Sequence, residues 1–476
     1  MCDHACRHVP RRLKAEWQPS YVPVVLTDVF TPPTRAALLD RLSVLPLEGA
    51  RVERSSAPAI KYFSSKKPLA KVRGFEGRHT VTMSNLSIST LMALFERHAA
   101  EALWHRHTTK QNGSCDVREW HYCSATNGSA ALDWVRAWPF MASVLHQMKA
   151  LAAASARTDN ASVHSENLWL GAGGVTAFNH YDASHNAFAQ VHGRKVFRIT
   201  VPRAAEARLQ PYSYLHPHFR RTQRSPVDSE IDSEIPPCQC ACGASELPEA
   251  RLEPGDVPGR YQEGDGELLE AHLEPGDVLI LPPFFFHHVS ALEGLSVALN
   301  AWAHDAPMLR VQRAIGAAGR RLGLLPMLHA SAREVRAAVL EAAAVSLVRA
   351  VGASAAADND DEGARAWLHS TMVIRWQTIR ARYPKAMLKL RRFCAGGESA
   401  RARAAWAARY TPAGTDAALQ GVAADLRALR EQGGDGLEMA NFVEQAALDV
   451  LDDVRTTGSF LTHCFAPNGT YAYSYM

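Results

Sequence analysis

The chain has 476 residues, which is enough for one large domain with a satellite or for two to three ordinary domains. Hydrophobic residues make up 47% and charged residues 21%, the proportions of an ordinary globular protein. The net charge of +4, from 52 basic and 48 acidic residues, is too small to indicate nucleic acid or an anionic membrane as the main partner.

The N-terminal residues 1–20 are polar and basic, and we expect them to be poorly ordered. They contain no apolar run typical of a signal peptide, and no later stretch approaches the roughly 18 apolar residues of a membrane span. The nine cysteines are an odd number, which favours reduced thiols and a cytoplasmic or nuclear location. We therefore expect no membrane partner.

The first elements in chain order are short. YVPVVLTDVF, from Tyr21, predicts a strand, and TPPTRAALLDRL predicts a loop followed by a helix. Residues 81–155 mix short strands with helical patterns such as ISTLMALFERHAAEAL. From 163 to 302 the apolar residues come in short runs between turn signals, which is typical of a β-barrel or jelly roll.

A long polar stretch interrupts that pattern at about 207–271, and we interpret it as a surface insertion. It contains LEPGDV at 252–257, a motif that returns at 273–278. Only the second copy leads into an apolar strand, so we take that copy as structural. The insertion also carries Cys238, Cys240 and Cys242. Three alternating cysteines fit a tetrahedral zinc site poorly, so free thiols are the preferred interpretation.

The last third is Ala-rich and helical in pattern. SAREVRAAVLEAAAVSLVRAVG opens with a capping box, Ser331 and Glu334, and closes on Gly352. After a linker at 352–363, a helix runs to Pro384, and LEMANFVEQAALDVLDDV predicts another near the end. The prediction is an α+β chain, with a double-stranded β-helix core and flanking helices over 21–306 and a helical region over 307–476.

The segment HYDASHNAFAQVHGRK carries the first candidate site. Side chains two apart in a strand share a face, so His180 and Asp182 converge. An imidazole and a carboxylate are two thirds of the facial triad that holds non-heme Fe(II). A distant strand ending in FFFHH offers His287 or His288 as the third ligand; neighbours in a strand face opposite ways, so only one can reach the metal.

Three ligands on one side of an octahedron leave three positions open, which a bidentate 2-oxo acid and O2 can fill. A bare His-x-Asp among 21 histidines is a weak signal, and the argument rests on the joint pattern. Lys195 completes that pattern, because it alternates with Phe197 and Ile199 on a barrel-facing side. A buried ammonium needs an anionic partner, and the distal carboxylate of 2-oxoglutarate would serve. The alternative is a solvated hairpin lysine.

These two segments resemble the JmjC-like hydroxylases, and most closely the asparaginyl hydroxylases among them. HYDASHNAFAQVHGRK is similar to that family's His-x-Asp strand with its Asn, Phe-Ala-Gln and Gly-x-Lys, and LEPGDVLILPPFFFHHVSALEGLSVALNAW is similar to its second ligand strand. The resemblance spans roughly residues 20–305. It implies a cupin or JmjC fold, with Fe(II), O2 and the cosubstrate 2-oxoglutarate.

Carried over to this chain, the resemblance favours His287 over His288 as the third ligand and makes Lys195 the partner of 2-oxoglutarate. It places other groups near the cosubstrate: Tyr122, Asn186, Asn300 and Trp302, with Ser124 and Thr126 less firmly. The family has a threonine three residues before the first ligand, where this chain has Ala177. Either a bulge restores Thr176 to that place or one hydrogen bond to the cosubstrate is lost.

The expected reaction is hydroxylation of an amino-acid side chain in a protein. A tRNA-modifying hydroxylase and a histone demethylase share the fold, and a non-catalytic metal-binding cupin is the alternative from another class. Nucleic acid is possible as a partner, but a phosphate-binding enzyme would be expected to show a basic groove. In the resembled family C-terminal helices pair two subunits, and the apolar face of Val335–Val351 suggests a homodimer here.

Overall fold

A computed structural model describes residues 7–9, 21–55, 59–60, 62–72, 80–83, 86–107, 119–156, 162–202, 209–223, 268–292, 294–322, 333–352, 361–377, 379 and 413–465. The chain divides into two compact units. The first comprises residues 1–63, 76–208 and 224–306, and the second comprises residues 64–75, 209–223 and 307–476.

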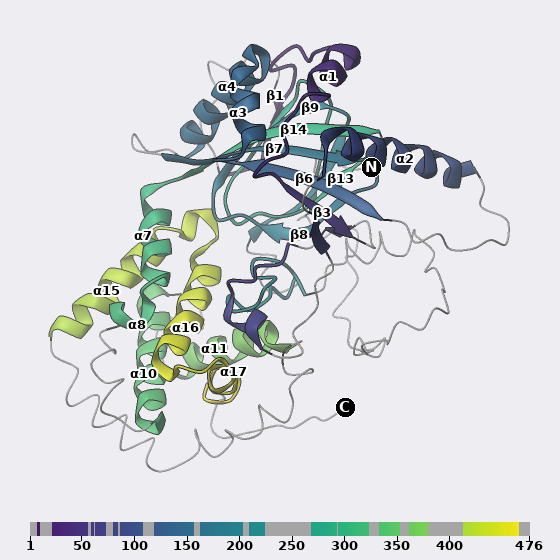
Figure 1. Ribbon diagram of the computed structural model, residues 1–476. Helices are drawn as coiled ribbons and strands as arrows, with labels where there is room; N and C mark the ends of the chain where they lie inside the picture. Colours follow the sequence, from purple (N-terminus) through teal and green to yellow (C-terminus); the bar gives the residue numbers. More distant parts are fainter. Residues whose placement is uncertain are drawn as a thin grey trace, which may run out of the picture. The chain divides into compact units, whose positions relative to one another are not determined.

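The first unit is built on two β-sheets (Figure 1). The larger has nine strands in the order β1-β2-β12-β9-β14-β7-β6-β3-β5, antiparallel except where β1 pairs with β2. Its strands are β1 (Arg7–Val9), β2 (Val24–Leu26), β3 (Arg51–Ser55), β5 (Thr80–Met83), β6 (Trp120–Thr126), β7 (Ser162–Ala172), β9 (His185–His192), β12 (Val278–Leu281) and β14 (Leu295–His304).

The smaller sheet has the order β11-β10-β13-β8-β4 and is antiparallel except between β4 and β8. Its strands are β4 (Ala59–Ile60), β8 (Thr176–Tyr181), β10 (Lys195–Thr200), β11 (Leu268–Leu273) and β13 (Phe286–Ala291). Consecutive strands alternate between the sheets from β7 to β10 and again from β11 to β14, so β8 and β10 lie in one sheet and β9 in the other. That crossing pattern is the expected double-stranded β-helix, and the α+β jelly-roll prediction is confirmed.

Two apolar cores follow from the alternation of side chains along the strands. The outward side chains of the large sheet, such as Leu168 and Ala189, pack beneath the helices. The inward side chains, such as Phe188 and Phe197, fill the space between the sheets. The helices of this unit are α1 (Arg35–Leu42), α2 (Ile88–His107), α3 (Ala130–Ala137) and α4 (Pro139–Ser155).

Local sequence fixes where these helices begin. Thr34 caps α1 by accepting a hydrogen bond from the amide of Ala37, and Ser129 caps α3 by accepting one from Leu132. Pro139 opens α4, where its missing N–H costs nothing. Helix α4 packs on β14, β9 and β7 and so covers the outer face of the large sheet (Figure 1).

Glycine is required at the turn between β9 and β10. Gly193 has a φ of +71°, and a Cβ there would lie 2.4 Å from the carbonyl oxygen of Leu295. The turn at His192, Gly193 and Arg194 therefore depends on this glycine. It sets the register that turns Lys195 into the barrel.

The second unit is helical. It contains the 3-10 helix η2 (Pro68–Lys71) and the helices α7 (Ala306–Ile315), α8 (Ala318–Arg321), α10 (Arg333–Val351), α11 (Asp361–Arg375), α15 (Ala413–Arg427), α16 (Asp435–Leu451) and α17 (Val454–His463), with η3 (Arg430–Gln432) between α15 and α16. The predicted helical third is therefore present. Residues 331 and 332, with the Ser331 half of the capping box, lie outside the described residues.

The stretch at 207–271 differs from the surface insertion that its polar composition predicts. Residues 209–223 belong to the helical unit, where Glu444 accepts the amide of Tyr214 and Gln223 donates to the carbonyls of Ile374 and Arg375. At the other end, Leu268–Leu273 is the jelly-roll strand β11. Hydrogen bonding to distant elements, which composition cannot reveal, decides both assignments. The first LEPGDV copy, Cys238, Cys240 and Cys242 lie outside the described residues.

The predicted homodimer is inferred from the apolar face of helix α10. Its apolar side chains are buried, and the helix packs against α11, α15 and α16 of the same chain. The face that suggested a partner subunit is therefore already covered, and the dimer stays a prediction without that support.

Three smaller expectations can be compared with the structure. Arg7–Val9 forms β1, and the rest of residues 1–20 lies outside the described part. Cys123 is a buried free thiol, whereas Cys464 is disulfide-bonded, so the expectation of reduced thiols does not hold at Cys464. None of the described helices has the length and apolar character needed to cross a bilayer.

Candidate metal centre

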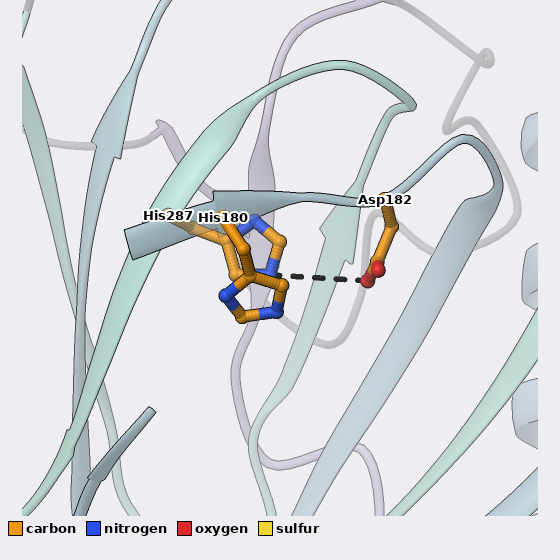
Figure 2. A group of neighbouring side chains, drawn as sticks. All are labelled: His180, Asp182 and His287. Atoms are coloured by element: carbon orange, nitrogen blue, oxygen red, sulfur yellow. Dashed lines mark ion pairs between the residues drawn. The ribbon is translucent and has the colours of Figure 1, made fainter. Parts of the chain in front are cut away.

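His180, Asp182 and His287 meet between the ends of two neighbouring strands (Figure 2). His180 lies on β8, directly opposite His287 on β13, and Asp182 follows the end of β8. One ligand atom from each residue lies within 4.8 Å of the others. Antiparallel pairing of β8 with β13 thus brings together Asp182 and His287, which are 105 residues apart in the sequence.

Both imidazoles are held in the tautomer that a metal needs. The Nδ1 of His180 lies 2.7 Å from the carbonyl oxygen of Phe178, and the Nδ1 of His287 lies 2.9 Å from that of Phe285. A carbonyl oxygen can only accept, so each Nδ1 must carry the hydrogen. Each Nε2 is then left as a lone-pair donor, the arrangement that orients histidine ligands in metal sites.

The carboxylate completes the set. The Asp182 Oδ2 lies 3.8 Å from the His287 Nε2, and it is buried without a hydrogen-bond donor among the described residues. Burial lowers the pKa of His287, although Asp182 opposes that effect. Two imidazole nitrogens and one unsatisfied carboxylate oxygen are the donor set expected for a divalent first-row metal, so these residues fit such an ion.

A strained turn holds the two ligand segments together. Phe284 has a φ of +70°, which is unusual for a bulky residue, and its amide donates to the carbonyl oxygen of Asp182 at 2.8 Å. The Phe284 ring is fully buried and lies beside Tyr181. Phe284 lies three residues before His287, so its conformation fixes how the chain enters β13.

The register also decides between the two histidines of FFFHH. His287 pairs with His180, whereas His288 faces the other side of the sheet, where it pairs with Arg198. Burial and the Arg198 charge lower the pKa of His288 to about 4. His287 is the histidine that stands in the triad.

Lys195 lies inside the barrel, as its alternation with Phe197 and Ile199 predicts. Only 4% of it is exposed. Its ammonium group lies 4.9 Å from the centre of the Phe188 ring and 6.0 Å from that of Tyr122. No carboxylate among the described residues pairs with it, and burial lowers the pKa of Lys195 to about 7. A buried cation facing only aromatic rings is a costly arrangement in the absence of an anion.

Most of the other predicted residues share this interior face. Tyr122 and Ser124 point inward from β6, since they pair with Gly171 and Trp169, whereas Thr126 is exposed at the strand end. Asn186 and Asn300 are buried and hydrogen-bonded to each other at 2.8 Å. Burial raises the pKa of Tyr122 well above its usual value.

Sequence reasoning missed two residues of this face. Asn167 and Trp169 on β7 both donate to the Asn300 Oδ1, at 2.9 and 2.8 Å. The Trp169 ring stacks on Tyr122 and meets Trp302 edge to face. The signal was present in ENLWLG, where Asn167 and Trp169 alternate with the outward Leu168 and Leu170.

Thr176 is not on the metal-facing side. The pairing of β8 with β13 shifts between His287 and Val289, so that Phe178 and Asn179 together oppose one residue, a β-bulge. Beyond the bulge Ala177 pairs with Val289 on the ligand face, and Thr176 pairs with Ser290 on the other. The bulge is present, but it does not restore the threonine, and the Thr176 hydroxyl is buried without a partner among the described residues.

Comparison with known proteins places these residues in one domain. The family model described as a cupin-like domain matches residues 138–307, a range that includes the triad and Lys195. No curated protein matches the chain. Among solved structures, the X-ray structure of E. coli ycfD is 12% identical with a TM-score of 0.29. That match covers 63% of this chain and 55% of that one, so the chain spans about half of its length.

Proposed function

We propose that this chain is an Fe(II)- and 2-oxoglutarate-dependent oxygenase that hydroxylates an amino-acid side chain of a protein. The observation that carries the proposal is the combination of an open His-Asp-His triad with a buried, unpaired ammonium in the same barrel. Fe(II), held by His180, Asp182 and His287, would supply the redox chemistry by which O2 and 2-oxoglutarate give succinate, carbon dioxide and a hydroxylated product.

The residues around the site suit a dicarboxylate. Lys195 would anchor the distal carboxylate by a charge-assisted hydrogen bond. That carboxylate would give the buried ammonium group the anionic partner that it lacks. The Tyr122 hydroxyl, which has no partner among the described residues, is a further donor on that face. The rings of Phe188 and Phe197 would exclude water from the methylene groups of the ligand.

Lys195 also separates this proposal from its rival of another class. A non-catalytic cupin needs the triad to bind a metal, but it has no use for a buried lysine that lacks an anion. A dicarboxylate cosubstrate explains both features at once, because it would chelate the metal at one end and reach the ammonium at the other.

Two considerations favour a protein as substrate. Both ligand strands resemble those of asparaginyl hydroxylases, and the net charge of +4 offers little for a phosphate backbone. A tRNA hydroxylase of the same fold remains the alternative outcome of the test below.

The test is succinate release from 2-oxoglutarate by the full chain with Fe(II) and O2. It is run over protein, peptide and tRNA panels, and mass spectrometry detects a gain of one oxygen. Asp182→Ala should abolish turnover, since two histidines hold iron poorly. It should also weaken Mn(II) binding measured without turnover. Full activity in Asp182→Ala would overturn the metal site, and oxidation of tRNA alone would overturn the protein substrate.

A second experiment isolates the cosubstrate anchor. Lys195→Met should raise the 2-oxoglutarate concentration needed for half-maximal turnover by about tenfold or more, because a charge-assisted bond is lost. Arg194→Met is the matched control: Arg194 is adjacent, but its side chain is 42% exposed and pairs with Glu274. An unchanged requirement in Lys195→Met would move the anchor to another cation, of which Arg194 and Arg198 are the nearest in sequence.

A further inference from the structure

The indole of Trp169 determines the orientation of a chain of buried amides. An indole nitrogen can only donate, so the Asn300 atom 2.8 Å from it must be the carbonyl oxygen. That oxygen also accepts from Asn167, which is completely buried. The partners of the Asn300 amide therefore fix it in one of its two orientations.

The orientation passes from Asn300 to Asn186. With its oxygen held by Trp169, Asn300 presents its Nδ2, which lies 2.8 Å from a side-chain atom of Asn186. A donor must meet an acceptor, so that atom is the Asn186 oxygen. The Asn186 Nδ2 is left as a pair of N–H donors, and among the described residues no acceptor meets it.

Those free donors lie on the same face of the barrel as Lys195. Asn186 and Phe188 are two apart on β9 and share the inward side, and the Lys195 ammonium lies 4.9 Å from the Phe188 ring. Had Asn186 been turned the other way, its carbonyl oxygen would face inward and repel an anion. The orientation of one amide thus changes the sign of the partial charge offered to a ligand.

We infer that Trp169 is a positioning residue, which acts through Asn300 to turn the Asn186 N–H groups toward a carboxylate of the bound cosubstrate. This inference rests on the proposed function, since it takes a 2-oxo dicarboxylate as the ligand. The Trp169 N–H group is a fixed donor on a rigid strand. It sets the orientation of the Asn300 amide, and the Asn300 amide sets the orientation of the Asn186 amide.

The test is a double-mutant cycle on the binding of 2-oxoglutarate to the full chain loaded with Mn(II), without turnover. Asn186→Ala should weaken binding by about tenfold, the cost of one hydrogen bond to a charged group. Trp169→Phe keeps a large ring but removes the N–H. It should weaken binding by about threefold or more, because the amide chain can then turn over. In the Asn186→Ala background Trp169→Phe should have no further effect.

The outcomes are distinct. Equal losses from Trp169→Phe in both backgrounds would mean that the ring acts by packing, and would overturn the inference. No loss in either background would overturn it as well. Trp134→Phe, on helix α3 and outside the amide chain, controls for loss of an indole. If the wild-type chain loaded with Mn(II) did not bind 2-oxoglutarate at all, the proposed function itself would fail, whatever Trp169 did.

Discussion

Lys195→Met should make the ligand-free protein more stable at neutral and acidic pH. The folded-state pKa of Lys195 is about 7, against an ordinary value of 10.5, because burial disfavours the charged form. Between these values the unfolded chain binds more protons than the folded one, so the free energy of unfolding rises with pH across that window. Below pH 7 the ammonium is charged in both states, and its burial costs the full amount.

The magnitude follows from the pKa difference of about 3.5, which at 1.36 kcal/mol for each pKa unit is about 5 kcal/mol. Methionine has a similar length and no charge to bury. The variant should therefore exceed wild type in free energy of unfolding by up to about 5 kcal/mol at pH 6, and the gain should vanish near pH 10.5.

The assay is urea unfolding of both proteins at pH 6, 8 and 10, without metal or ligand. Arg194→Met, which removes an exposed cation from the same turn, should show no such pH-dependent gain. A Lys195→Met protein that is less stable than wild type at pH 6, or a difference that does not change with pH, would refute the reasoning from burial.

The other predictions concern the turn, the helical unit and the assembly. Gly193→Ala should destabilise the protein by more than Gly294→Ala. Both glycines have a positive φ, so a side chain at either position costs about 1–2 kcal/mol of backbone strain. Only at Gly193 would the added Cβ also lie 2.4 Å from a backbone oxygen. Comparable losses in thermal unfolding would contradict this. Arg375→Met should cost about 3–5 kcal/mol, because the fully buried Glu444 would lose its cationic partner. The exposed Arg349→Met should cost at most about 1 kcal/mol, and a similar small loss for Arg375 would show that its pair is dispensable. Light scattering of the full chain tests the predicted homodimer, which a monomeric mass would exclude.

Much of the site is determined by local sequence. Strand alternation puts His180 and Asp182 on one face and Lys195 on the face of Phe197 and Ile199, because successive side chains in a strand point to opposite sides. The glycine at 193 marks the turn that sets this register. The same periodicity predicts the jelly roll and the helical third, since each element carries its own pattern.

Other features depend on which strands become neighbours. The pairing of β13 with β8 selects His287 over His288, and the bulge in β8 brings Ala177 to the ligand face in place of Thr176. The pairing of β7 with β14 brings Trp169 to Asn300. Sequence patterns give the face of a side chain but not the partner strand opposite it, because register is settled by hydrogen bonds between residues more than a hundred positions apart.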